Sequence, residues 1–453
     1  MVTKKEDMAN ELNAHFINKI KKLKMHMPTP KTDILNQLKN TPTPKGDEMN
    51  LMSLTEADLN KIIKDLKKTT ANGHDTINSI VIHDSYEATK QILLHGINLA
   101  LATGKYPQQF KITKLVPQVK AGKDPQEAAS YRPISNLNIL GKIYEQAFFD
   151  QTAAFINSSN KLNKDQHGGR PGHSTTTCLV ELWEQARKNV NNKEKTAILA
   201  IEMSAAYDLC CHKILVEKCR LLGIGKPAVK FLKSFLEKRS QYVELGGKTS
   251  TILQNGPFGA VQGGKSSGDL FLYYLNELPM QLLKKVNKKD QANSMGKEFV
   301  DDLSILARAT SVEKLLTQLK FDYEKVNNFL IDHLMVINES KSQLMILFPP
   351  KNIGDLKLKL KNSQIPHQHN IKVLGVTLSD NMKWDDHLWK GSNNMAKTIS
   401  NKIAVGVEGR GSGDDRREAD TVIMTNRTKI HSSVLILFTV QFLFITEIYV
   451  FFV

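Results

Sequence analysis

The chain has 453 residues, 41% of them hydrophobic, which is enough apolar material for a large core or for two or three subdomains. Its 62 Lys and Arg residues against 46 Asp and Glu give a net charge of +16. Such a surplus suits a polyanionic partner, although a solvated basic surface has the same composition. The cysteines Cys178, Cys210, Cys211 and Cys219 are too few and too clustered for a disulfide framework, so a reducing compartment is expected.

The first part of the chain, residues 1–52, is expected to be a basic extension. Prolines interrupt it, and no apolar run follows its opening charges, so we expect no signal peptide. Its lysines suit either phosphate contacts or a solvated helix face. Thr55 then begins a helix, because Asp58 stands at the reciprocal capping position and residues 59–66 carry an apolar face.

Short apolar runs and turn residues alternate through residues 67–253. The run at 196–201 is apolar throughout, which is typical of a fully buried strand. Gly246 and Gly247 separate two β-type runs and indicate a hairpin. The other expected elements are a loop at 67–80, helices at 92–101, 141–149, 212–222 and 228–237, strands at 114–120, 242–245 and 249–253, and a Gly-rich stretch at 166–176.

Helices and strands remain mixed in the later part of the chain. The expected elements are helices at 269–278 and 312–331, two strands folded at a tight acidic turn within 298–307, and strands at 344–348 and 373–378. An antiparallel hairpin among helices indicates an α+β fold rather than a doubly wound parallel sheet.

Three acidic residues carry the clearest chemical signal. Asp301 and Asp302 are adjacent between apolar strands, where they repel each other unless a divalent cation compensates their charge; an ordinary surface turn has the same composition. Glu202 directly follows the apolar run at 196–201, so it emerges at the sheet edge where it can meet the pair. Two ions bridged by such carboxylates activate a primer 3′-hydroxyl and stabilise the leaving pyrophosphate. Tyr207 is expected beside the incoming sugar, with ordinary core packing as its alternative role.

A glycine-rich loop occupies residues 259–264. Gln262 offers both a donor and an acceptor, and Gly263 lets the backbone approach a base pair, although a plain flexible loop has the same composition. With the two residues that follow, the loop also matches the phosphate-binding pattern G-x-x-x-x-G-K-[ST]. That pattern needs a buried parallel strand before it, and Gly256 and Pro257 break the preceding residues. A P-loop NTPase is therefore a minor alternative.

Two further segments suggest other sites. Residues 210–212 with Cys219 resemble zinc ligands, but they lack a C-x-x-C knuckle. Residues 432–453 are hydrophobic and long enough to span a bilayer. A membrane anchor and a foreign or frame-shifted tail both stay open for that segment.

Seven short motifs follow one another at characteristic spacings: YRPIS (131–135), QHGGRPGHST (166–175), IEMSAAYD (201–208), GAVQGG (259–264), FVDD (299–302), INESK (337–341) and VLGVTL (373–378). In this order they resemble the reverse transcriptases of non-LTR (LINE-like) retrotransposons, over most of the chain. The resemblance implies a right-hand polymerase fold with fingers, a palm whose antiparallel sheet packs on helices, and an incomplete thumb. The implied domains are a basic extension at 1–52, fingers with interleaved palm entry at 53–195, the catalytic palm at 196–350, a primer-grip hairpin and the start of the thumb at 351–396, and a divergent tail at 397–453.

The resemblance also implies an RNA-directed DNA polymerase site. Glu202, Asp301 and Asp302 match the metal-binding acids, for two Mg²⁺ ions or for Mn²⁺ in their place. The implied partners are an RNA template, a DNA primer and deoxynucleoside triphosphates, in the nucleus or cytoplasm. The implied substrate contacts are Tyr207 as the sugar-discriminating aromatic, Gln262 and Gly263 beneath the nascent base pair, Lys120, Arg132 and Arg170 in the fingers, and Lys341 beside the triphosphate.

The chain departs from the family pattern at several of these motifs. Glu202 stands where the family has aspartate, and an extra methylene that displaces a catalytic group by roughly an ångström can lower the rate about 10²-fold. Val261 and Gly264 stand where proline and serine are usual. We therefore expect weak or absent activity, with a catalytically dead nucleic-acid-binding remnant as the main alternative. The stretch before residue 53 is too short for an endonuclease domain, so we expect a fragment of a larger element.

Overall fold

The structure is a computed structural model that describes residues 4–44, 46, 48–260, 266–283, 293–350, 356–361, 363–385 and 387. The helices and strands named below belong to one unit, Met1–Trp384. Among the site residues expected from the sequence, Gln262 and Gly263 lie outside the described residues, as does the tail at 397–453.

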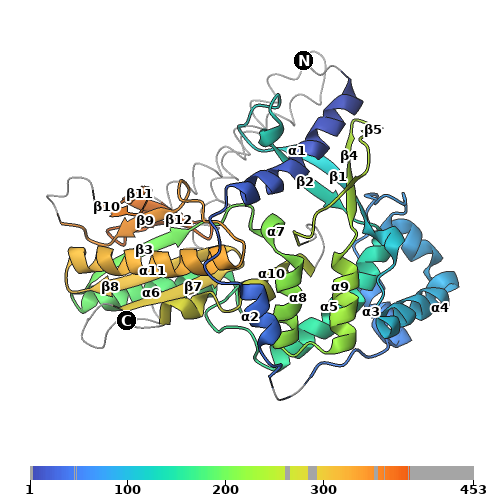
Figure 1. Ribbon diagram of the computed structural model, residues 1–453, viewed down its shortest axis with the longest axis horizontal. Coiled ribbons are helices and arrows are strands. Elements are labelled where there is room, and N and C mark those ends of the chain that lie inside the picture. The colour runs from blue at the N-terminus through green and yellow to red at the C-terminus, as the bar shows by residue number, and fades with distance from the viewer. Residues whose placement is uncertain are drawn as a thin grey trace, which may run out of the picture. The chain divides into compact units, whose positions relative to one another are not determined.

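A four-stranded antiparallel sheet has the order β7-β8-β3-β9 (Figure 1). Its strands are β3 (Lys195–Ile201), β7 (Asn293–Phe299), β8 (Asp302–Ala309) and β9 (Gln343–Ile346). The predicted buried strand at 196–201 is confirmed as β3, which pairs on both sides. The two strands expected within 298–307 are also confirmed, because β7 and β8 meet at a tight turn.

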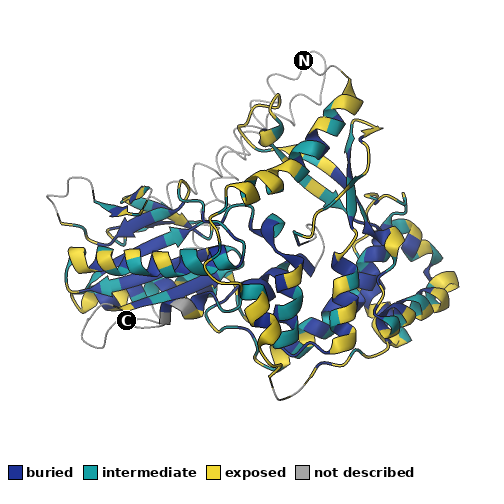
Figure 2. Cartoon of the chain, viewed as in Figure 1, coloured by how far each residue is buried: buried dark blue, intermediate teal, exposed yellow. Residues whose placement is uncertain are grey.

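Helices cover both faces of this sheet. Successive side chains of a strand point to opposite faces, and Leu199 of β3 packs in the same core cluster as Leu315 of α11 (Val312–Asp332). Its neighbour Ile198 joins a second cluster, with Leu182 of α6 (Thr175–Asn191). Figure 2 shows the strands mostly buried and the outer side of α11 carrying exposed positions.

A second, five-stranded sheet is built from two distant stretches of the chain. Strand β1 pairs antiparallel with β2 and parallel with β4. Gly246 and Gly247 both have positive φ, 55° and 78°, and close the expected hairpin. The strand expected at 249–253 is wrong as one element, because one extra residue shifts the pairing with β4 from Glu244↔Thr249 to Gln241↔Leu253 and leaves two short strands. The strands are β1 (Ile112–Val119), β2 (Tyr131–Asn136), β4 (Ser240–Leu245), β5 (Lys248–Thr249) and β6 (Leu253–Gln254).

The amino-terminal helix α1 (Lys5–Met25) packs on the five-stranded sheet (Figure 1). Leu12 and Phe16 share a small apolar cluster with Leu115 of β1 and Val243 of β4. A solvated helix face was one of the two alternatives for the lysines of this segment, but its packing on a sheet was not expected from the sequence.

Most of the remaining helices pack together in the main apolar core. The predicted cap is confirmed, because Thr55 and Asp58 exchange hydrogen bonds at the start of α3. Phe148 and Phe231 stack with ring centroids 4.5 Å apart between α5 and α9. The bounds are α2 (Ile34–Asn40), α3 (Glu56–Asp65), α4 (Ser79–Thr103), α5 (Ile139–Ser158), α7 (Ala206–Leu209), α8 (His212–Leu221), α9 (Lys226–Leu236) and α10 (Ser266–Leu275), with short 3-10 turns η1 (Gln108–Lys111), η2 (Ala128–Ser130) and η3 (Pro279–Leu283).

Two small hairpins follow the four-stranded sheet in the chain. They are β10 (Lys357–Lys359) with β11 (Gln364–Pro366), and β12 (Asn370–Val373) with β13 (Val376–Ser379). The single strand expected at 373–378 is wrong, because Leu374 and Gly375 have positive φ, 47° and 86°, and fold it into a hairpin.

No helix within the described part of the chain is both long and apolar enough to cross a membrane. The hydrophobic segment at 432–453 lies outside that part.

Candidate active site

The three acids expected to bind metal are brought to one end of the four-stranded sheet. Ile201 of β3 pairs with Leu303 of β8, so Glu202 and Asp302 each stand next to that pair. Asp301 lies in the turn that leads into β8. Burial raises the pKa of Asp302 to about 6, and the charges of Asp301 and Glu202 add to that effect. Burial and Glu202 likewise raise the pKa of Asp301.

The raised pKa values of Asp301 and Asp302 show whether the site suits a cation. The charge of Glu202 raises the pKa of both aspartates, so the three carboxylates form an oxygen donor set whose repulsion a divalent ion relieves. Mg²⁺ commonly takes one or two carboxylates together with substrate phosphates. The donor set therefore fits the divalent metal that the sequence predicts.

Glu202 is held by the segment between α11 and β9. Its backbone carbonyl accepts a 2.7 Å hydrogen bond from Asn338 N–H, and its N–H donates to Ser342 Oγ. Lys341 Nζ donates to Glu202 Oε1. Both charged groups are substantially exposed, so this ion pair adds little stability. It does place the Lys341 ammonium group against the Glu202 carboxylate.

The turn that carries Asp301 has an unusual backbone. Val300 has φ of +59°, in the left-handed region that a β-branched residue rarely adopts. A conformation of this kind costs on the order of 1–3 kcal/mol and persists only where neighbouring groups enforce it.

Tyr207 lies on α7, just beyond Glu202. Burial raises its pKa to about 12, and the charge of Asp301 contributes, which places the phenol near the acidic turn. Its ring tilts against Phe271 with centroids 4.9 Å apart. Its carbonyl accepts a 2.8 Å hydrogen bond from Ala260 N–H, so the start of the glycine-rich loop is tied to this aromatic.

Three of the expected basic residues lie near one another. Burial lowers the pKa of Lys120, and nearby positive charges that include those of Arg132 and Lys341 lower it further. Arg170 is placed differently, because its Nη1 donates to the carbonyl oxygens of Asn163 and Gln166 at 2.6 and 3.1 Å.

A cavity of about 290 Å³ lies between α1 and the five-stranded sheet. Its lining includes Lys19, Lys120, Asp208 and Arg239. Lys19 Nζ reaches Asp208 Oδ2 at 3.4 Å. From the sequence, Lys19 was expected either to contact phosphate or to lie on a solvated helix face. The charge pattern gave no indication that it lines a cavity beside the segment that contains Tyr207.

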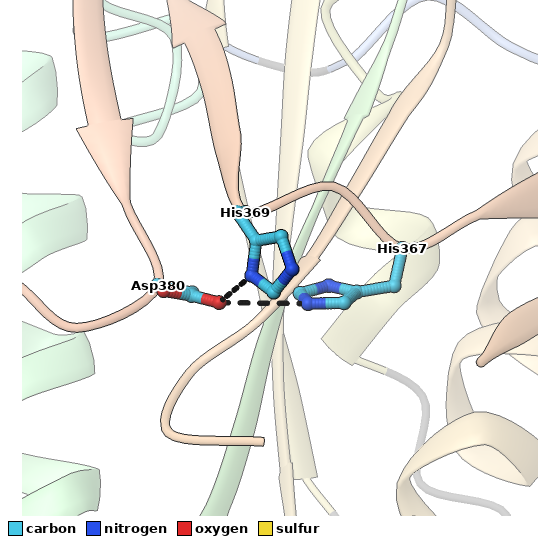
Figure 3. A group of neighbouring side chains, drawn as sticks. All are labelled: His367, His369 and Asp380. Carbon is cyan, nitrogen blue, oxygen red and sulfur yellow. Dashed lines mark hydrogen bonds and ion pairs between the residues drawn. The ribbon is translucent and has the colours of Figure 1, made fainter. Parts of the chain in front are cut away.

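A second cluster of metal-ligand type joins the β12–β13 hairpin to β9 (Figure 3). The rings of His367 and His369 both point at the Asp380 carboxylate, with nitrogen–oxygen distances of 3.5 and 2.7 Å. Nδ1 of His367 accepts a hydrogen bond from Ile346 N–H, so the neutral ring carries its proton on Nε2, which faces Asp380. A protonated nitrogen is not a metal ligand. The cluster is therefore a brace, in which His369 is hydrogen-bonded to Asp380 and His367 is hydrogen-bonded to β9.

The residues before the glycine-rich loop do not form the strand that a phosphate-binding loop needs. They form β6, a two-residue strand that pairs antiparallel with β4. The His212 ring, one of the zinc candidates, contacts Gly259 O through Nε2 at 2.9 Å.

The family model for "Reverse transcriptase (RNA-dependent DNA polymerase)" matches residues 120–378, which is more than half of the chain. The chain belongs to the reverse transcriptase family. In the terms of this family, the four-stranded antiparallel sheet is the palm of a right-hand α+β polymerase fold.

The relatives of this family member are proteins of mobile elements. It is 24% identical over 354 residues to "RNA-directed DNA polymerase from mobile element jockey" of Drosophila melanogaster, covering 78% of this chain and 38% of that protein. It is 23% identical over 373 residues to "Probable RNA-directed DNA polymerase from transposon X-element" of the same species, covering 79% of this chain and 40% of that one. The chain thus spans less than half the length of these relatives.

A solved structure of apo telomerase from Candida Tropicalis, truncated from its C-terminal domain, is also similar. The TM-score is 0.40 at 12% sequence identity, over 61% of this chain and 55% of that one.

Proposed function

We propose that the chain acts as an RNA-directed DNA polymerase of a LINE-like retrotransposon, which adds deoxynucleotides to a primer 3′-hydroxyl. The observation that carries the proposal is that Glu202, Asp301 and Asp302 lie at one end of the palm sheet, close enough for the charge of Glu202 to act on both aspartates. Family membership supports the same reaction. The partners we propose are an RNA template, a DNA primer and deoxynucleoside triphosphates, met in the nucleus or cytoplasm.

The three acids would hold two Mg²⁺ ions, or Mn²⁺ in their place. When bound, the ions supply Lewis acidity to the attacking hydroxyl and to the leaving pyrophosphate. Tyr207 would lie under the incoming sugar and exclude a 2′-hydroxyl. Lys120, Arg132 and Lys341 would place positive charge on the triphosphate side, and the proximity of their charges supports a shared role. Arg170 would act on the template through the loop that it orders, and Gln262 and Gly263 would underlie the nascent base pair.

The rate of this polymerase is proposed to be low because of Glu202. Its longer side chain reaches Lys341, so one carboxylate oxygen is engaged in an ion pair. A displacement of roughly an ångström can cost about 10²-fold in rate.

Primer extension on an RNA template with Mg²⁺ or Mn²⁺ tests the proposal. We expect slow extension by the unmodified chain and an increase of about tenfold to 10²-fold for Glu202→Asp, because aspartate withdraws the carboxylate from Lys341. Asp302→Asn should abolish extension. Glu87→Asp, the same change at an exposed side chain of α4, should leave the rate unchanged. Robust extension by the unmodified chain would contradict the role given to Glu202.

The alternative is a catalytically dead nucleic-acid-binding remnant, which the Glu202–Lys341 ion pair favours. It predicts RNA binding that weakens steeply with salt, no extension even for Glu202→Asp, and no effect of Asp301→Ala on binding. Those three results together would replace the polymerase proposal.

A further inference from the structure

The turn that carries the metal-binding acids is clamped by a glutamine from a distant loop. Oε1 of Gln166 accepts hydrogen bonds from Val300 N–H at 3.0 Å and from Gly168 N–H at 2.7 Å. Its Nε2 lies 3.4 Å from Val300 O, as a donor. The single side-chain amide therefore satisfies both backbone polar groups of the residue just before Asp301. Gln166 is 1% exposed, so water does not compete for these bonds.

The clamp acts on the residue whose backbone is strained. Val300 holds φ of +59°, which valine does not adopt without support. This conformation turns the chain between Phe299, the last residue of β7, and Asp302, the first residue of β8, which pair with each other. The amide therefore supports the backbone conformation on which the directions of Asp301 and Asp302 depend.

The backbone on both sides of Gln166 is docked onto β7. His167 N–H donates to Glu298 O at 2.7 Å, and Glu298 N–H donates to Asp165 O at 2.9 Å. Gly168 completes the fit, because a Cβ there would lie 2.4 Å from Val300 Cγ2 and 2.6 Å from Val300 N. The loop that supplies the amide is thus built to approach this one turn closely.

We infer that Gln166 is a positioning residue that sets the geometry of the metal-binding acids, with Gly168 providing the space for the contact. The inference rests on the proposed function, since it assigns Asp301 and Asp302 to divalent metal. Partners that orient metal ligands from behind typically change metal affinity by about tenfold to 100-fold when they are removed.

The chain offers a close control for the amide. Gln151 on α5 makes the same pair of bonds to one residue, accepting from Met52 N–H at 2.9 Å and donating to Met52 O at 3.0 Å. Gly256 serves as the control for Gly168, since a Cβ there meets nothing within 4 Å.

The experiment measures Mn²⁺ affinity of the purified full chain by the electron paramagnetic resonance signal of free Mn²⁺, with folding checked by circular dichroism. We expect Gln166→Met and Gly168→Ala each to weaken Mn²⁺ binding about tenfold or more. Gln151→Met and Gly256→Ala should bind as the unmodified chain does. If Gln166→Met does not fold, Gly168→Ala with its control carries the test.

The possible failures are distinguishable. If the unmodified chain binds no Mn²⁺, or binds it equally well after Asp302→Asn, the proposed metal site falls and the inference with it. If that site is intact but Gln166→Met and Gly168→Ala bind Mn²⁺ within twofold of the unmodified chain, only the inference is overturned. Equal losses in the Gln151→Met or Gly256→Ala control would overturn it as well.

Discussion

At the scale of single residues, the fold makes the ionised form of the Asp302 carboxylate unfavourable. The pKa of Asp302 is raised to about 6 from an ordinary value of 3.8, by burial and then by Asp301 and Glu202. The folded chain therefore holds a proton more tightly than the unfolded chain does. Stability is lost as the pH rises from about 4 to about 6, where the unfolded state is already ionised.

Asp302→Asn should therefore raise the melting temperature of the metal-free chain above pH 6, because the amide has no charge to bury. The gain should shrink as the pH falls toward 4, since both forms are then neutral at this position. Melting curves at several pH values measure it. A gain that does not change with pH would show that the charge of Asp302 is not its source.

The affinity for metal should also depend on the ionisation of Asp302, but here ionisation is favourable. Binding needs the ionised carboxylate, so Mn²⁺ affinity should fall by up to about tenfold per pH unit below pH 6. Titrations between pH 5 and 7.5 measure it. A flat profile would contradict the assignment of Asp302 as a ligand.

At the scale of elements, sequence patterns predicted best where one local cause dominates. The apolar run at 196–201 predicted β3, and the capping pair Thr55 and Asp58 predicted the start of α3.

Helix α6 was not predicted. The glycine-rich stretch before it masked its start at Ser174, whose side chain accepts a hydrogen bond from Thr177 N–H. The helix expected at 92–101 is only the last part of α4, which begins at the Asn78 cap. Polar residues on the outer face of α4 weaken the periodic signal, while packing against α5 and α9 sustains the helix.

The β12–β13 hairpin is a short element that should depend on its brace. Asp380→Asn removes the carboxylate that accepts from His369 at 2.7 Å, and hydrogen bonds to charged groups are worth about 1.5–3 kcal/mol. We expect faster amide exchange across 370–379 in this variant, measured by hydrogen–deuterium exchange. Asp84→Asn, on the exposed side of α4, should leave that exchange unchanged. Equal exchange in both variants would contradict the brace.

At the scale of the whole molecule, the amino-terminal segment is part of the fold. Phe16 is buried with Leu115 and Val243, which join α1 to the five-stranded sheet. Phe16→Ala should lower the free energy of unfolding by about 3 kcal/mol, because it empties an aromatic site in a small cluster. Met25→Ala on the same helix should be nearly neutral, since Met25 is 81% exposed. Denaturant titration compares the two, and equal effects would mean that α1 is only loosely attached.

The sequence by itself determined the local chemistry of this protein. An apolar strand that ends in an acid, a pair of acids at a turn, and motifs in family order are readable because each depends on neighbouring residues. The tertiary structure alone decided which distant segments meet. Gln166 clamps Val300 across 134 residues, Lys19 reaches Asp208 across 189, and Lys341 holds Glu202 across 139. These contacts follow from how sheets, loops and helices pack, and no spacing within the sequence encodes them locally.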